Sequence, residues 1–156
     1  MDYYTIENLM DIVLRGAEIL GAKTENDGAF EIAKRSRGTP RIANRFLKRV
    51  RDYSEIRGKG IITQDIAMEA LALLGVDELG LDELDREILN GIIENYNGGP
   101  VGVETMSLLL GEDRRTLEEV YEPYLVKIGF LKRTHRGRMV TEKGYLHIGK
   151  EITVKE

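Results

Sequence analysis

The side chains that could do chemistry in this chain are mainly cations, and they are concentrated in two windows. Lys34 to Lys59 holds ten Lys or Arg residues against two acids, and Tyr124 to Thr141 holds five against none. The net charge is −4 at pH 7, but the local distribution of charge, rather than the sum, decides what a surface binds. Phosphate-bearing nucleic acid is therefore a candidate partner for either window.

Composition excludes several other classes of protein. The chain has no Cys and only two His residues, His135 and His147, so neither a disulfide framework nor a zinc centre is expected. No apolar run approaches the roughly 18 residues that span a bilayer, and the first ten residues do not form a signal peptide. We therefore expect a cytoplasmic protein with no metal site and no membrane partner.

One segment imitates a phosphate-binding loop. Gly16 to Thr24 reads GAEILGAKT, but Ala22 separates the second glycine from Lys23. The segment also leaves a predicted helix, whereas a P-loop leaves a buried strand so that its amides converge on phosphate. We therefore do not expect this segment to bind ATP, nor the chain to hydrolyse it alone.

The first half of the chain is predicted to be a unit of four helices, because its apolar residues recur about every 3.6 positions. The third helix has the clearest start, with Thr39 as N-cap and Pro40 at the first helical position. Beyond Val76 the periodicity is lost and the sequence becomes acidic, which places a domain boundary between residues 1–76 and 77–156. The helices are expected to end at Gly21, near Gly38, at Gly58 and at Gly75.

The second half is predicted to be a winged helix, a helix-turn-helix variant with a β-hairpin. A helix over 82–95, a short extended stretch at 101–103 and a helix ending at Gly111 come first. A third helix follows, with a capping box of Thr116 and Glu119 and a kink at Pro123. Alternating strands at 130–134 and 138–141 then flank a tight turn, and a helix over 142–150 closes the domain.

The hairpin, rather than the third helix, is the expected DNA contact. The third helix carries three acids that would repel phosphates, Glu118, Glu119 and Glu122. The hairpin carries four cations with no acid among them to compensate, Lys132, Arg133, Arg136 and Arg138. A narrow turn bearing arginines suits the minor groove. Strand alternation should put Lys132 and Arg133 on opposite faces, so the four cannot all contact DNA together.

Several long runs resemble the RuvB family, the ATP-driven branch-migration motors of bacterial recombination. In the first half these runs are SRGTPRIANR at 36–45 and RVRDY at 49–53. In the second half they are LGVDELGLD at 74–82, GGPVG at 98–102, YEPYL at 121–125, and GFL at 129–131 with RGR at 136–138. The resemblance covers nearly the whole chain. It implies a mainly α fold, in which a four-helix AAA+ lid domain precedes a winged-helix domain with a small β-hairpin wing.

The resemblance also implies roles for individual residues. Arg41 lies at the second position of a capped helix, where a cation is unfavourable unless an anion is bound, and it matches the sensor arginine that reaches ATP phosphates. Tyr4 matches a nucleotide-contacting tyrosine, and Pro40 is expected to line the same pocket. The matching wing arginines that touch DNA are Arg133 and Arg138, with Arg136 and Lys132 expected to help. His135 departs from the family, which usually has proline there.

The remaining implications concern activity and assembly. The family is a DNA-translocating ATPase, or helicase, that acts in DNA recombination and repair and binds ATP or ADP with Mg²⁺ through a domain that nothing here matches. We therefore expect this chain to be inactive alone and to bind no cofactor tightly. The implied partners are duplex DNA and Holliday junctions, the RuvA and RuvC proteins of the complex, and further copies in a hexamer. By itself the chain is expected to be monomeric.

Two other functions stay open at this point. A sequence-specific winged-helix transcription regulator with a helical effector domain would use the third helix for base reading, which its acids disfavour. A protein-interaction module would instead use that acidic helix face for a partner. It would show no salt-dependent DNA binding, and the basic hairpin is unexpected for it.

Overall fold

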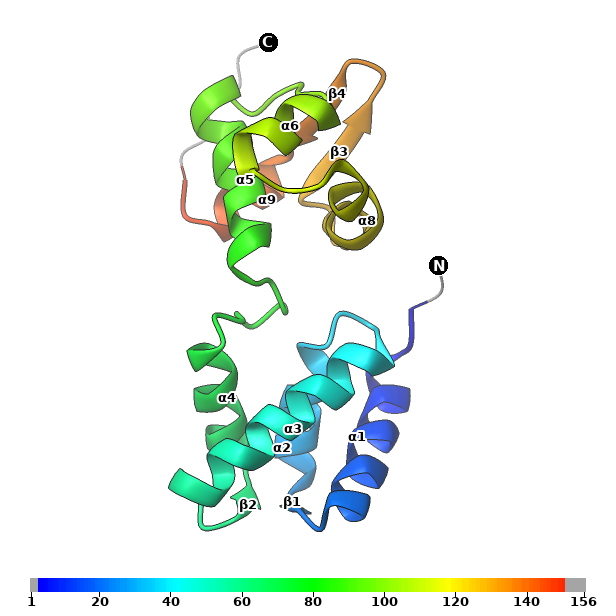
Figure 1. The fold of residues 1–156 in the computed structure, drawn as a ribbon, viewed down its shortest axis with the longest axis vertical. Coiled ribbons are helices and arrows are strands. Elements are labelled where there is room, and N and C mark those ends of the chain that lie inside the picture. The colour runs from blue at the N-terminus through cyan, green and yellow to red at the C-terminus, as the bar shows by residue number, and fades with distance from the viewer. Residues whose placement is uncertain (1–2, 151–156) are drawn as a thin grey trace. The chain divides into compact units, whose positions relative to one another are not determined.

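A computed structural model describes residues 3–150 of the chain, and the fold is mainly α-helical with small strands, as the sequence predicts (Figure 1). The chain divides into two compact units between Asp82 and Glu83. Residues 1–2 and 151–156, which the sequence assigns to the outer ends of the two domains, lie outside the described range. No helix within residues 3–150 is long and apolar enough to cross a membrane.

The first unit contains the four predicted helices. Threonine N-caps begin three of them, because the hydroxyls of Thr5, Thr39 and Thr63 accept hydrogen bonds from backbone amides three residues later. The first helix ends at Gly21, which adopts the left-handed conformation with φ 70°. The helices are α1 (Ile6–Leu20), α2 (Asn26–Lys34), α3 (Pro40–Arg57) and α4 (Gln64–Leu73).

One apolar core holds these helices together. Val13 of α1, Ile32 of α2 and Leu71 of α4 are fully buried, and Leu47 of α3 is 1% exposed. Two short parallel strands, β1 (Lys23–Thr24) and β2 (Ile61–Ile62), join the loops at one end of the unit. The sequence does not predict these strands, because two residues are too short for an alternating pattern to be seen.

The segment after α4 is held to the first unit. The carboxylate of Asp77 accepts hydrogen bonds from the amides of Leu79 and Leu81, both at 2.9 Å. Gly80, at φ 83°, lies so close to α2 that an added Cβ would be 2.5 Å from the carbonyl oxygen of Arg35. Residues 77–82 therefore pack with the first unit.

The second unit follows the predicted winged-helix order. Its first helix, α5, ends near Tyr96, and the extended residue Val101 forms an isolated antiparallel bridge with Arg138. The last helix ends three residues earlier than predicted, with Gly149 at φ 72° shortly beyond it. The elements are α5 (Glu83–Tyr96), α6 (Val103–Leu110), α7 (Arg114–Thr116), α8 (Glu122–Lys127), β3 (Leu131–Thr134), β4 (Gly137–Val140) and α9 (Glu142–His147).

The third helix of the winged helix begins earlier than expected. The predicted capping box of Thr116 and Glu119 is wrong, because Asp113 is the N-cap and accepts from the amide of Thr116 at 3.1 Å. An ionised carboxylate is a good N-cap, and it begins the helix one turn before the threonine. A π-helical turn over Leu117–Tyr121 then separates α7 from α8. The predicted irregularity next to Pro123 thus takes the form of a widened turn, since proline cannot donate a helical hydrogen bond.

Candidate nucleic-acid interface

The wing is a hairpin of two four-residue strands, each of which carries one arginine. Arg133 of β3 lies directly opposite Arg138 of β4, and Lys132 lies opposite Met139. Directly opposed residues of an antiparallel pair share a face of the hairpin. The predicted separation is therefore confirmed in the register, with Arg133 and Arg138 on one face and Lys132 on the other. Arg136 occupies the exposed turn, where its amide donates to Thr134 Oγ1 at 3.2 Å.

Backbone contacts fix this hairpin against the second unit. The amide of Val101 donates to the carbonyl of Arg138 at 2.9 Å, and the amide of Arg138 donates back at 2.7 Å. Gly137 has φ 134°, and a Cβ placed there would be 2.5 Å from the carbonyl carbon of Val101. Only glycine allows the two backbones to approach this closely. The start of β4, next to the wing turn, is consequently held against Val101.

Glu122 lies beneath the two arginines with no exposed surface. Its carboxylate accepts hydrogen bonds from Nη2 of Arg133 at 3.0 Å and from Nε of Arg138 at 2.9 Å. Arg138 is 17% exposed and Arg133 is 47% exposed. A buried carboxylate is costly unless it is paired, and here two cations pair with it. Nη2 of Arg138 also donates to Oε2 of Glu118 at 3.5 Å, so a second acid of the third helix joins the cluster.

Two expectations about charge are therefore wrong. The cations of the hairpin do have a compensating acid, which comes from the third helix rather than from the hairpin itself. The acids of that helix also do not form one exposed repulsive face. Glu122 is buried, Glu118 pairs with Arg114 at 3.2 Å, and Glu119 pairs with Arg115 at 2.7 Å. Both exposed pairs have i,i+4 spacing, which brings side chains together on a helix.

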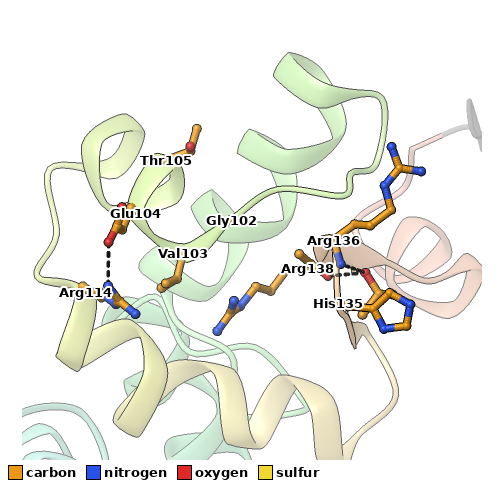
Figure 2. Close-up of a pocket in the computed structure, with 10 residues that line it drawn as sticks. Gly102, Val103, Glu104, Thr105, Arg114, His135, Arg136 and Arg138 are labelled. Carbon is orange, nitrogen blue, oxygen red and sulfur yellow. Dashed lines mark hydrogen bonds and ion pairs between the residues drawn. The ribbon is translucent and has the colours of Figure 1, made fainter.

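An open groove of about 350 Å³ lies between the wing turn and the start of α6. Figure 2 shows Arg138 extending into this groove toward Val103, while the side chain of Arg136 points away from it. Gly102 is the N-cap of α6 and supplies no side-chain hydrogen bond to the first amides of the helix. Arg114, on the opposite wall, is bound to Glu104 at 2.7 Å. The groove thus combines helix N-terminal amides with arginine side chains, an arrangement suited to anions.

The residues predicted to sense nucleotide gather at the start of α3. The amide of Tyr4 donates to the carbonyl of Gly38 at 2.8 Å, which places Tyr4 beside the loop that leads into Pro40 and Arg41. Tyr4 is 48% exposed and Arg41 is also exposed. Within residues 3–150, no ion pair is described for Arg41. These residues can contact a nucleotide that is held elsewhere, but they offer neither a phosphate-binding loop nor an acid for Mg²⁺.

Most of the other lid cations are solvated. Arg45, Lys48 and Arg49 are exposed on α3, and Arg51 pairs with Asp52 and with Glu55. The imitation phosphate loop leaves α1, as expected, and so cannot converge its amides on phosphate.

A buried ionic network in the lid was not found from the sequence. Glu31 is 3% exposed and binds Arg35 at 3.0 Å, Lys34 at 3.3 Å and Gln64 at 3.2 Å. Burial acts to raise the pKa of Glu31, but the hydrogen bonds from Gln64 and Lys34 and the charges of Lys34 and Arg35 together lower it. The i,i+4 spacing of Glu31 and Arg35 was the available signal, whereas the contact with Gln64 depends on tertiary packing.

Comparison with known proteins assigns both units. The family model described as the RuvB AAA lid domain matches residues 4–77, and that described as the RuvB C-terminal winged helix domain matches residues 78–149. The chain belongs to the RuvB family. The mainly helical fold with a lid and a winged helix, predicted from the sequence, is thereby confirmed. Neither matched model describes a transcription regulator.

Individual relatives extend this assignment. The chain is 68% identical over 155 residues to a protein of Fusobacterium nucleatum and 59% identical over 147 residues to one of Nostoc punctiforme. Each is named as the Holliday junction branch migration complex subunit RuvB. The solved structure of the Thermotoga maritima RuvB branch migration motor matches with a TM-score of 0.94 at 49% identity.

These alignments cover almost all of this chain but only part of each relative. They span 99% and 94% of this chain and 46% and 40% of the two curated relatives. For the Thermotoga maritima structure the shares are 97% and 51%. The chain therefore spans about half the length of the relatives that it matches.

Proposed function

We propose that this chain is the nucleotide-sensing and DNA-contacting part of an ATP-driven motor for branch migration at Holliday junctions, acting in DNA recombination and repair. Residues 1–76 are the proposed lid that senses the nucleotide, and residues 77–156, of which 77–82 pack with the first unit, are the proposed winged-helix domain that binds duplex DNA. The names of the relatives support the motor function. The observation that carries the DNA-binding part is the pairing of Arg133 and Arg138 on one face of the wing.

The wing contacts the DNA backbone without reading its sequence. Arg133 and Arg138 make the principal contacts, Arg136 adds one from the turn, and Lys132 reaches DNA only from the opposite face. Arginine side chains in a narrow hairpin suit phosphates and the minor groove. A motor that moves along any duplex requires such sequence-independent contacts. One copy should bind with a Kd of about 10⁻⁴ to 10⁻⁶ M, the range of non-specific binding, and the affinity should fall with salt.

The lid reports the state of the nucleotide. Arg41 contacts the phosphates of ATP, and Tyr4 and Pro40 contact the remainder of the nucleotide. In the complete protein ATP or ADP binds with Mg²⁺ on a separate nucleotide-binding domain, so this chain binds neither tightly by itself. When that domain is present, Arg41→Ala should lower ATP hydrolysis. In this chain the same substitution should leave DNA binding unchanged.

Assembly compensates for the weak contact of one wing. In a homohexamer the wings act together, so their combined affinity exceeds that of a single copy. The RuvA and RuvC proteins are the proposed partners at the junction. The chain by itself is a monomer, and the cytoplasm is its proposed location.

A fluorescence anisotropy titration tests the DNA contact. A labelled random-sequence duplex is titrated with the chain at about 50 and 200 mM salt. We expect binding that weakens with salt and that Arg133→Ala/Arg138→Ala abolishes. The matched control is Arg45→Ala/Arg49→Ala, which removes two exposed arginines of α3 and therefore the same charge.

The two double variants separate the possible sites. Loss of binding in the wing variant alone supports the proposal. Loss in the α3 variant alone would place DNA on the lid. Absence of any binding at low salt would leave the protein-interaction module as the better explanation.

A further inference from the structure

The buried carboxylate of Glu122 accepts hydrogen bonds from Arg133 and Arg138, and in both arginines the donors are Nε and Nη2, which form one edge of the guanidinium group. Nε and Nη2 of Arg133 donate to Oε1 of Glu122 at 3.3 and 3.0 Å. Nε and Nη2 of Arg138 donate to Oε2 and Oε1 of the same carboxylate at 2.9 and 3.1 Å. Glu122 therefore receives four charged hydrogen bonds from the two side chains, and it lies in α8, outside the hairpin.

This arrangement leaves the other edge of each guanidinium available. The group is a rigid planar fork with five N–H donors. Once Nε and Nη2 are bound, the plane of the group is fixed and Nη1 lies at the opposite edge. No bond from Nη1 of Arg133 or Arg138 is described within residues 3–150. Each arginine can thus donate to a phosphate without releasing Glu122.

If only its charge mattered, Glu122 would weaken DNA binding. A negative charge beneath a DNA-binding surface repels phosphates, so removing it should strengthen binding. If Glu122 instead orients the two arginines, its removal lets their side chains move among several rotamers. Binding DNA must then restrict them again, at a cost in entropy. The sign of the effect on affinity therefore separates the two roles.

We propose that Glu122 is a positioning residue for DNA binding, which acts through Arg133 and Arg138 and fixes their outer edges toward the phosphates. The inference rests on the proposed function of the wing. Glu122 thereby strengthens DNA binding although its own charge repels phosphates.

The test compares Glu122→Gln with a matched control, Glu119→Gln. Both substitutions raise the net charge by one, but Glu119 is exposed and pairs with Arg115 instead of the wing. With the random-sequence duplex, Glu122→Gln should bind more weakly than the unsubstituted chain. The slope of log K against log [salt] should change little, because both arginines still neutralise phosphates and only the entropic cost of restricting them rises. Glu119→Gln should bind as tightly as the unsubstituted chain or slightly more tightly.

Two further variants distinguish positioning from a general loss of structure. In an Arg133→Ala background, where Arg138 still contacts DNA, Glu122→Gln should weaken binding less than it does in the unsubstituted chain, because only one of the two side chains that it positions remains. Arg133→Lys/Arg138→Lys keeps both charges but cannot present the paired Nε and Nη2 edge. It should bind more weakly than the unsubstituted chain but more tightly than the alanine pair, because its charges still attract phosphates. Circular dichroism shows which variants fold. If Glu122→Gln does not fold, the lysine pair tests the positioning role in its place.

The outcomes separate this inference from the proposed function. If the unsubstituted chain does not bind DNA, or if the wing alanine pair binds normally, both are overturned. If the alanine pair loses binding while Glu122→Gln binds as tightly as the unsubstituted chain or more tightly, only the positioning role is overturned. Normal binding by the lysine pair overturns that role in the same way.

Discussion

Gly137→Ala should lower the free energy of unfolding of the second unit far more than a glycine-to-alanine change at an open turn does. The new Cβ would lie 2.5, 2.6 and 2.9 Å from the carbonyl carbon, oxygen and nitrogen of Val101. These are backbone atoms, so the bridge between Val101 and Arg138 must open. It contains two hydrogen bonds, each contributing about 1 kcal/mol. The φ of 134° at Gly137 costs a further 1–3 kcal/mol for alanine, roughly.

The predicted loss is therefore about 4 kcal/mol, a large part of the roughly 5–15 kcal/mol by which domains are stable. Gly111→Ala is the matched control, because Gly111 has φ 65° and no atom within 4 Å of an added Cβ. It carries only the conformational cost of about 1 kcal/mol.

Urea denaturation followed by circular dichroism gives the free energy of unfolding for both variants. Hydrogen exchange at the amides of Val101 and Arg138 reports whether the bridge opens. If Gly137→Ala is no less stable than Gly111→Ala and its two amides stay protected, the argument from close approach is wrong.

Three other substitutions test separate parts of the fold. Thr39→Ala removes the N-cap of α3 and should lower the free energy of unfolding by about 1 kcal/mol in urea titrations. Because the pKa of Glu31 is lower in the folded lid than its usual 4.5, its stabilising effect is complete above that value and is lost as the pH falls through the folded pKa. Lowering the pH from 5 to 3 should therefore reduce the melting temperature of the unsubstituted chain more steeply than that of Glu31→Gln. Parallel curves of melting temperature against pH would contradict this. Met106→Ala, at a site with no exposure, should cost about 2–5 kcal/mol, whereas Leu108→Ala on the same helix, at 86% exposure, should cost under about 0.5 kcal/mol.

The helices of the first unit were predictable because their signals are local. Thr39 followed by Pro40 marks the start of α3, and Gly21 marks the end of α1, through backbone conformations that neighbouring residues determine. The start of the third winged-helix helix was misplaced although its signal is also local. Asp113 and Thr116 both suit an N-cap, and the sequence pattern does not rank them.

The candidate site was only partly predictable, since its decisive contacts are non-local. The alternation of β3 separates Lys132 from Arg133, and the hairpin register follows from the short turn. The sequence does not reveal the contacts of Glu122, because 11 positions separate it from Arg133 and 16 from Arg138. The sequence predicts an exposed acid on this helix, whereas packing of the hairpin against the helix buries it. The contact of Gly80 with α2 has the same non-local origin.

An NMR titration of the ¹⁵N-labelled chain with a random-sequence duplex would test the central claim most directly. We expect the largest salt-sensitive shifts at amides of the wing, Leu131 to Val140, and of the first turn of α6. The amides of α3 that surround Arg45 should shift little. Shifts concentrated on α3, or on the exposed face of α7, would contradict the assignment of DNA binding to the wing.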